Sequence, residues 1–254
     1  MNLENIGVPI AIIKTDTKKQ KHYPIISVDD SETARTSYNQ INLKSNEKFQ
    51  QIPNPNTERQ ILYITGRSGS GKSYFTLHYC REYQRLYPKR SIYLFSALEE
   101  DSTLDQLKGL KRIKLSEEFC NDDIEAEDFK ESMVIFDDTD VISSKVIRNK
   151  VNSIMNQILQ VGRHFEISCI ITTHTACNGG STKIVLNEAH SVIIFPNGLG
   201  GRSLKYLLDS YLGLDKAQIK KIKNLKSRWV CINKTFPMSI LSEREAYVIK
   251  PTDD

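Results

Sequence analysis

The sequence lacks any long apolar run: nowhere do 18 apolar residues follow one another, so it predicts no membrane-spanning helix. The amino terminus also lacks the basic-then-apolar layout of an export signal, and we expect a protein that is not exported. Cysteines are few and scattered: there are five and no Cys-x-x-Cys pair, which argues against a disulfide framework or a zinc site. The remaining composition, with 39% apolar and 26% charged residues among 254, is that of an ordinary globular protein.

The net charge of +4 is small but unevenly distributed. Acidic residues outnumber basic ones between positions 99 and 131, whereas basic residues dominate between 202 and 228. This asymmetry predicts a surface for a polyanion in the second of these segments.

A glycine-rich loop is the strongest motif in the chain. The pattern Gly66-x-x-x-x-Gly71-Lys72-Ser73 follows a run of strand formers and precedes a helical pattern, which is the usual context of a phosphate-binding P-loop. Its glycines let successive backbone N–H groups surround a phosphate, Lys72 would reach the β- and γ-phosphates, and Ser73 would bind Mg²⁺. We therefore predict an ATP and Mg²⁺ site that contains Gly66, Arg67, Ser68, Gly69, Ser70, Gly71, Lys72 and Ser73.

Strand and helix patterns alternate from residue 59 onward, which predicts an α/β P-loop NTPase domain over 59–254 with a mostly parallel sheet flanked by helices. The predicted strands are 61–64, 91–98, 132–138, 167–173, 191–195, 229–233 and 246–249. The predicted helices are 71–87, 146–165, 203–213 and 215–225. Residues 1–58 are predicted as an extension with short strands at 8–14 and 23–28, ending at a Pro-Asn-Pro boundary; a hairpin, a subunit-contact arm and a tail all fit it.

A second half of the ATP site is expected at the end of the strand Met133-Val134-Ile135-Phe136-Asp137. A P-loop ATPase holds Mg²⁺ with its loop hydroxyl and an aspartate at the end of such a strand, so Asp137 is the predicted metal ligand. Asp138 follows at once, and we predict that it is the catalytic acid that activates the attacking water.

Three further residues are candidates for contact with the terminal phosphate. Arg163 ends a long helical pattern and could serve the ATP of an adjacent subunit, or simply complement its own helix dipole; the sequence leaves both open. Thr173 and His174 end the strand beside Asp137, where a residue that senses the γ-phosphate or the water is expected.

These segments in order resemble a known group of proteins. GRSGSGKS, VIFDD, the GRH before an apolar strand, ITTH at its end, SVIIFPNG and a closing basic segment resemble the poxvirus-type genome-packaging ATPases of large double-stranded DNA viruses, within the FtsK/HerA superfamily. The resemblance covers about residues 59–249. At the sensor position many relatives have glutamine where this chain has Thr173 and His174, so the residue that orients the water stays open.

The resemblance implies an ATPase with a RecA/FtsK-like fold that assembles as a homo-oligomeric ring, expected to be a hexamer, and moves double-stranded DNA into a preformed capsid. It implies capsid or portal-vertex proteins as partners, and the host cytoplasm at the site of virus assembly, or the virus particle, as the location. It matches Lys72 and Ser73 to the phosphate and Mg²⁺ positions, Asp137 and Asp138 to the metal and catalytic acids, and Arg163 to the arginine that acts on a neighbour.

A DNA translocase must contact phosphates whatever the base sequence. The basic candidates are Lys216, Lys220, Lys221, Lys223, Lys226 and Arg228. On a helix three of these lysines would share an outer face, although a charged face kept for solubility explains them equally well. The loop 175–183, with Lys183, is a further candidate.

Two other functions remain open at this point. One is a different DNA-dependent ATPase of the same superfamily, acting in segregation, conjugation or recombination. The other is a P-loop nucleotide or nucleoside kinase, although Asp138 after the metal ligand favours hydrolysis.

Overall fold

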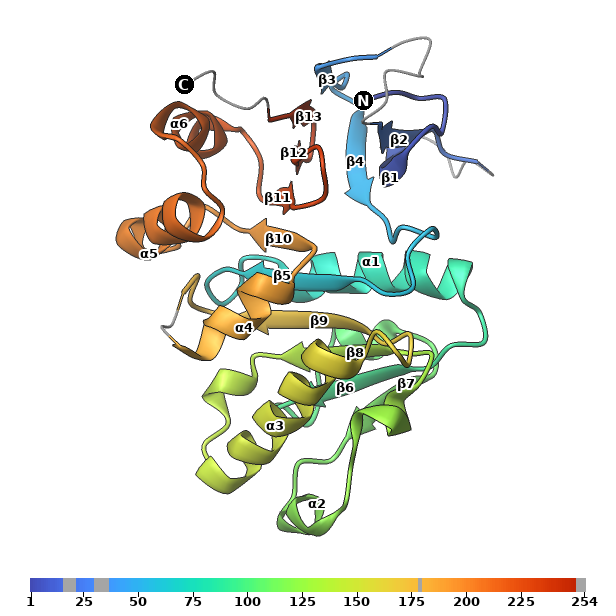
Figure 1. Ribbon diagram of the computed structural model, residues 1–254, viewed down its shortest axis with the longest axis vertical. Coiled ribbons are helices and arrows are strands. Elements are labelled where there is room, and N and C mark those ends of the chain that lie inside the picture. Colours follow the sequence, from blue (N-terminus) through green and yellow to red (C-terminus); the bar gives the residue numbers. More distant parts are fainter. Residues whose placement is uncertain (16–21, 30–36, 178–179, 250–254) are drawn as a thin grey trace.

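A computed structural model describes residues 1–15, 22–29, 37–177 and 180–249 (Figure 1). Its centre is a sheet with the strand order β3-β13-β12-β11-β10-β5-β9-β8-β6-β7. The six strands from β10 to β7 are parallel: β5 (Ile61–Thr65), β6 (Ile92–Ser96), β7 (Leu110–Ile113), β8 (Met133–Asp137), β9 (Ser168–Thr173) and β10 (Ser191–Ile194). The other four continue it in antiparallel fashion: β11 (Val230–Asn233), β12 (Ser239–Ser242), β13 (Glu245–Val248) and β3 (Gln40–Asn42).

The central strands form because their side chains can be buried on both faces. Every residue of β5 and β8 is buried, as expected for apolar runs in a parallel sheet that helices cover on both sides. The connections β5-α1-β6 and β8-α3-β9 run in opposite directions across the sheet. Since such crossovers are right-handed, α1 (Lys72–Leu86) covers one face and α3 (Lys145–Val161) the other, where it contacts α4 (Gly180–Glu188). The predicted α/β class is confirmed.

Shorter elements complete the domain. The acidic segment after β6 contains the 3₁₀ turn η1 (Leu104–Gln106), α2 (Glu117–Asn121) and the turn η2 (Ala126–Phe129), and the turn η3 (Thr139–Val141) follows β8. The basic segment forms α5 (Gly201–Tyr206), a π-helical turn η4 (Leu207–Tyr211) and α6 (Lys216–Asn224). The predicted loop 175–183 is partly helical, because α4 begins at Gly180; positions 178 and 179 lie outside the described residues.

The amino-terminal segment forms a small sheet of its own, drawn in blue in Figure 1, with the order β2-β1-β4. The two predicted strands are present as β1 (Val8–Thr15) and β2 (Ile25–Val28), and β4 (Glu47–Gln51) joins them. This sheet is tied to α1, because Gln50 Nε2 donates to the His78 carbonyl at 3.3 Å and Lys14 pairs with Glu82 at 3.4 Å. β3 instead pairs with β13, so part of the extension belongs to the large sheet.

Across the part of the chain that the structure describes, no helix has the length and apolar character needed to cross a membrane.

Candidate nucleotide-binding site

The P-loop occupies residues 66–71, between the end of β5 and the start of α1. A Cβ on Gly66 would lie 2.6 Å from Ser70 Oγ and 2.8 Å from Phe195 Cβ, so the closed turn has room only for glycine there. Gly71 adopts φ 112°, a left-handed value that a side chain would strain. Ser70 Oγ is buried and, among the described residues, has no hydrogen-bond partner. A phosphate oxygen would satisfy this hydroxyl, so the loop fits an anion.

The loop tip is open to solvent. Arg67, Ser68 and Gly69 are exposed, while Ser73 in the first turn of α1 is half-buried. The first turn of α1 therefore presents its unpaired N–H groups and the positive end of its dipole at an accessible edge.

Lys72 joins the P-loop to Asp138. Its side chain is buried, with Nζ donating to the Gly66 carbonyl at 3.0 Å and lying 3.4 Å from Asp138 Oδ2. The strand order explains this proximity, because only β9 lies between β5 and β8. The predicted meeting of the P-loop with the acidic strand end is therefore present in the structure.

Asp137 is buried and lies next to a second carboxylate. Its side chain is only 3% exposed, and the Thr172 hydroxyl lies 2.9 Å from its Oδ1. Burial first, and then the neighbouring charge of Asp138, raise the pKa of Asp137 to about 6. A divalent cation would offset the cost of burying the Asp137 charge and the repulsion between the two carboxylates. The available oxygen ligands, from Asp137, Ser73 and the phosphates, therefore fit Mg²⁺.

Asp138 is oriented by an unusual backbone and by two partners. It adopts φ 45° and ψ 41°, a left-handed conformation that aspartate tolerates better than most residues. Its backbone N–H donates to Thr172 Oγ1 at 3.0 Å, and its Oδ2 lies 3.0 Å from His174 Nε2. The strained residue therefore projects its carboxylate toward Lys72 and His174, as residues at functional sites often do.

His174 bridges Lys72 and Asp138. Its Nδ1 lies 3.2 Å from Lys72 Nζ, and an ammonium group can only donate, so Nδ1 accepts and the ring proton is on Nε2. Nε2–H then donates to Asp138. The structure thus brings His174 between Lys72 and Asp138.

Thr172 was missed as a site residue. The sequence prediction named Thr173, but the Thr173 hydroxyl bonds to Tyr63 OH at 2.9 Å and to the Thr175 carbonyl at 3.0 Å, while the Thr172 hydroxyl contacts both aspartates. Side chains alternate along a strand, so only one of two adjacent threonines can face the end of β8. The pairing of Phe136 with Ile171 places Thr172 opposite Asp137.

Arg163 and this site lie at opposite ends of the parallel strands. Arg163 precedes β9, whereas the site is at the end of β9, and its exposed side chain pairs with Glu58 at 2.7 Å. The carbonyl end of α3 is instead bound by buried Arg59, which donates to the Ile158 and Leu159 oxygens at 2.8 and 2.9 Å. The helix-capping role that the sequence left open for Arg163 is therefore filled by Arg59.

A relative is known from a virophage. The chain is 41% identical over 202 residues to the uncharacterized protein V3 of Sputnik virophage, covering 78% of this chain and 80% of the relative. No protein-family model matches the sequence.

Solved structures share the fold. The DNA-packaging ATPase B204 of Sulfolobus turreted icosahedral virus is 18% identical, with a TM-score of 0.51 over 74% of this chain and 98% of that protein. The cytoplasmic domain of the type VII secretion ATPase EccC from Thermomonospora curvata is 12% identical, with a TM-score of 0.52 over 90% of this chain and 31% of that protein. At these identities the likeness concerns the fold, and it confirms the resemblance to packaging and FtsK/HerA-type ATPases at that level.

Proposed function

This chain belongs to the family of virophage protein V3 and has the fold of FtsK/HerA-type ATPases, and from this premise we propose that it hydrolyses ATP to move double-stranded DNA into a viral capsid. The observation that carries the proposal is the meeting of Lys72, Asp138 and His174 within hydrogen-bond or ion-pair distance at the P-loop. A cation, a carboxylate and an imidazole close together at a P-loop support the hydrolysis of a terminal phosphate by an activated water.

Each residue has a role that follows from its position. The N–H groups of the P-loop bind the phosphate chain, and Lys72 exchanges its contact with the Gly66 carbonyl for phosphate oxygens. Asp138 accepts a proton from the attacking water, and His174 holds its carboxylate in place. Asp137 and Ser73 would hold Mg²⁺, which neutralises charge on the phosphates.

We assign Arg163 to the ATP site of an adjacent subunit in a homo-oligomeric ring. The resemblance to packaging ATPases suggests that this ring is a hexamer. Arg163 is exposed and remote from the ATP site of its own chain, which suits an arginine that contacts a neighbour's γ-phosphate. Thr173 stays a candidate sensor, coupled through Tyr63 to the interior of the sheet.

A groove between α5 and α6 is the proposed contact for DNA. Ile219 and Ile222 are buried while Lys216, Lys220 and Lys223 are exposed, so α6 presents a basic face. Together with Lys205 these lysines line a cavity of about 540 Å³, in which they outnumber the two carboxylates Asp209 and Asp215. Lys221 is excluded from the group, because its ammonium lies over the Tyr247 ring, 3.6 Å from the centroid.

The decisive experiment measures ATP turnover with and without duplex DNA. We expect stimulation by DNA that weakens as salt rises, because released counterions drive binding. Lys72→Ala is the control and should abolish turnover in both conditions. Turnover that ignores DNA but requires a nucleoside acceptor would refute the proposal and favour the kinase.

A second DNA-dependent ATPase function, in segregation, conjugation or recombination, shares this site chemistry. It is separated from packaging by location: packaging requires the protein at sites of virus assembly in the host cytoplasm, or on particles, in contact with capsid or portal-vertex proteins. Labelling the chain in infected cells would distinguish the two.

A further inference from the structure

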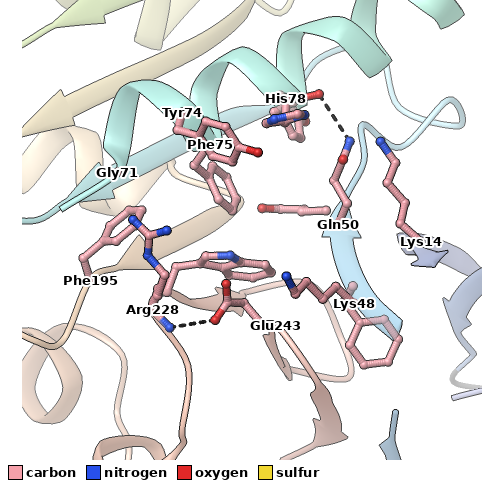
Figure 2. A pocket seen from close by; sticks show the side chains of 14 residues that line it. Lys14, Lys48, Gln50, Gly71, Tyr74, Phe75, His78, Phe195, Arg228 and Glu243 are labelled. Atoms are coloured by element: carbon pink, nitrogen blue, oxygen red, sulfur yellow. Dashed lines mark hydrogen bonds between the residues drawn. The ribbon is translucent and has the colours of Figure 1, made fainter. Parts of the chain in front are cut away.

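A groove borders the P-loop at Gly71 (Figure 2). It is a cavity of about 460 Å³ that starts at Gly71 and is lined by Phe75, Phe195, Arg228 and Trp229, with β4 of the amino-terminal sheet across from α1. Cavities of this size hold drug-sized organic ligands. The groove and the phosphate site share Gly71, so one molecule can occupy both.

The direction of a bound nucleotide follows from the strand order. β8, which ends at Asp137, and β9, which is followed by His174, lie on one side of β5, while β10 and β11 lie on the other. A nucleotide with its terminal phosphate beside Asp138 must extend its nucleoside away from β8. Phe195 follows β10 and Trp229 precedes β11, so the groove lies where that extension leads.

The walls of the groove suit a ligand that has an aromatic ring and a negatively charged group. The half-buried indole of Trp229 packs against the ring of Phe75, with centroids 5.1 Å apart and planes at 71°, which fixes its orientation. The guanidinium of exposed Arg228 lies beside the P-loop: its Nη2 would be 3.4 Å from a Cβ on Gly71. The sequence had grouped this arginine with the lysines of α6, but the structure places it at the phosphate end of the groove.

Two polar side chains of the groove, Gln50 and Glu243, are engaged with the protein. Gln50 Nε2 donates to the His78 carbonyl and to Glu82, and Glu243 accepts from the Arg228 backbone N–H at 3.0 Å (Figure 2). The aromatic side chains and the Arg228 guanidinium are therefore the groups on which the assignment of a ligand rests.

We propose that this groove binds the nucleoside part of ATP, with Trp229 as the stacking surface and Arg228 as the cation beside the phosphate chain. The proposal rests on the nucleotide-binding function above and adds the residues that hold the base.

Trp229 is the only tryptophan of the sequence, so its fluorescence reports on the groove alone. The experiment titrates the protein with Mg·ATP and with inorganic tripolyphosphate, which has the phosphates but no base, and measures binding independently by calorimetry. We expect ATP to change the emission and to bind at least about tenfold more tightly than tripolyphosphate, which should leave the emission unchanged. ATP that binds without altering the emission, with tripolyphosphate binding equally tightly, would overturn the proposal.

The other outcomes are also decisive. If neither compound binds, the nucleotide-binding function is refuted and the groove assignment falls with it. If a single-stranded oligonucleotide changes the emission and ATP does not, the groove binds DNA instead.

Two variants test the named residues. Arg228→Gln should weaken ATP binding about tenfold, because it removes a charged donor, whereas Arg244→Gln on the neighbouring exposed turn should not. Trp229→Leu should weaken ATP binding about tenfold while tripolyphosphate binding stays the same, and Trp229→Phe should retain most of the affinity. Equal losses for both ligands in Trp229→Leu, or Trp229→Phe binding ATP as weakly as Trp229→Leu, would contradict the stacking role.

Discussion

Replacement of Asp137 by asparagine isolates the cost of keeping a carboxylate at this buried position without a metal ion. The Thr172 hydroxyl can still donate to the side-chain oxygen of asparagine, so the hydrogen bond at 2.9 Å survives. What disappears is a charge that is almost fully buried and that faces the charge of Asp138. We therefore expect Asp137→Asn to stabilise the metal-free protein.

The pH dependence gives the size of the effect. The pKa of Asp137 is raised from 3.8 to about 6 in the folded chain, so the folded state binds the proton more tightly than the unfolded state. The stability this proton provides is fully present below pH 3.8 and is lost as the pH rises through 6. Linkage gives a penalty for the wild type of about 1.5 kcal/mol at pH 5 and about 3 kcal/mol at pH 7.5.

Urea unfolding at several pH values, in the presence of a chelator, measures this difference. Asp137→Asn should gain stability over the wild type as the pH rises from 5 to 7.5, and Mg·ATP should reverse the order, because it stabilises only the form that binds it. Asp140→Asn, an exposed carboxylate nearby, is the matched control and should change stability by less than about 0.5 kcal/mol. A stability difference that does not vary with pH would refute the reasoning.

Three further predictions follow from the site and its supports. Asp138→Asn should fold, since asparagine tolerates the left-handed backbone, and should bind ATP while losing at least about 100-fold in turnover; near-normal turnover would remove Asp138 from the mechanism. Arg163→Ala should lose about 10³-fold in turnover yet regain activity when mixed with Lys72→Ala chains, whereas Glu58→Gln should stay active; failure of the mixture would contradict action on a neighbour. Arg59→Ala should lower the free energy of unfolding by about 2–4 kcal/mol, because the Leu159 carbonyl loses its donor and the Ile158 carbonyl keeps only the Gly162 N–H, and an unchanged urea midpoint would show that water replaces the arginine.

The central strands and the P-loop could be predicted because their signals are local. β5 and β8 are continuous apolar runs of the kind that parallel sheets require, and the P-loop spacing is fixed by the turn it must make. The meeting of the loop with the acidic strand end followed from the motif, because a P-loop ATPase holds Mg²⁺ with an aspartate at the end of another core strand.

The amino-terminal sheet was harder to predict because its partners are distant. β4 reads Glu-Lys-Phe-Gln-Gln, a polar sequence with no strand pattern, and it is stabilised by pairing with β1 and by the bond from Gln51 to Ser191 at 3.2 Å. Helix α4 was missed for a related reason: glycines at its start indicated a loop, although Val185 and Leu186 are buried.

The sequence did not identify the site residues whose side-chain direction depends on strand register rather than on a local motif. Whether Thr172 or Thr173 faces the aspartates depends on the pairing of β8 with β9, which no local pattern specifies. Arg228 follows the turn after α6, so its position beside Gly71 depends on where β11 joins the sheet.

The ATP site and Arg163 lie at opposite ends of the parallel strands, and helix α3 spans the distance between them. α3 has 17 residues and runs from the side of Asp138 to the side of Arg163, a length of about 25 Å at 1.5 Å per residue. An arginine side chain cannot cross that distance, so Arg163 cannot act on the phosphates that Lys72 of the same chain binds. If Arg163 is catalytic, a complete site therefore exists only between two chains, and turnover per chain must fall on dilution as the assembly dissociates.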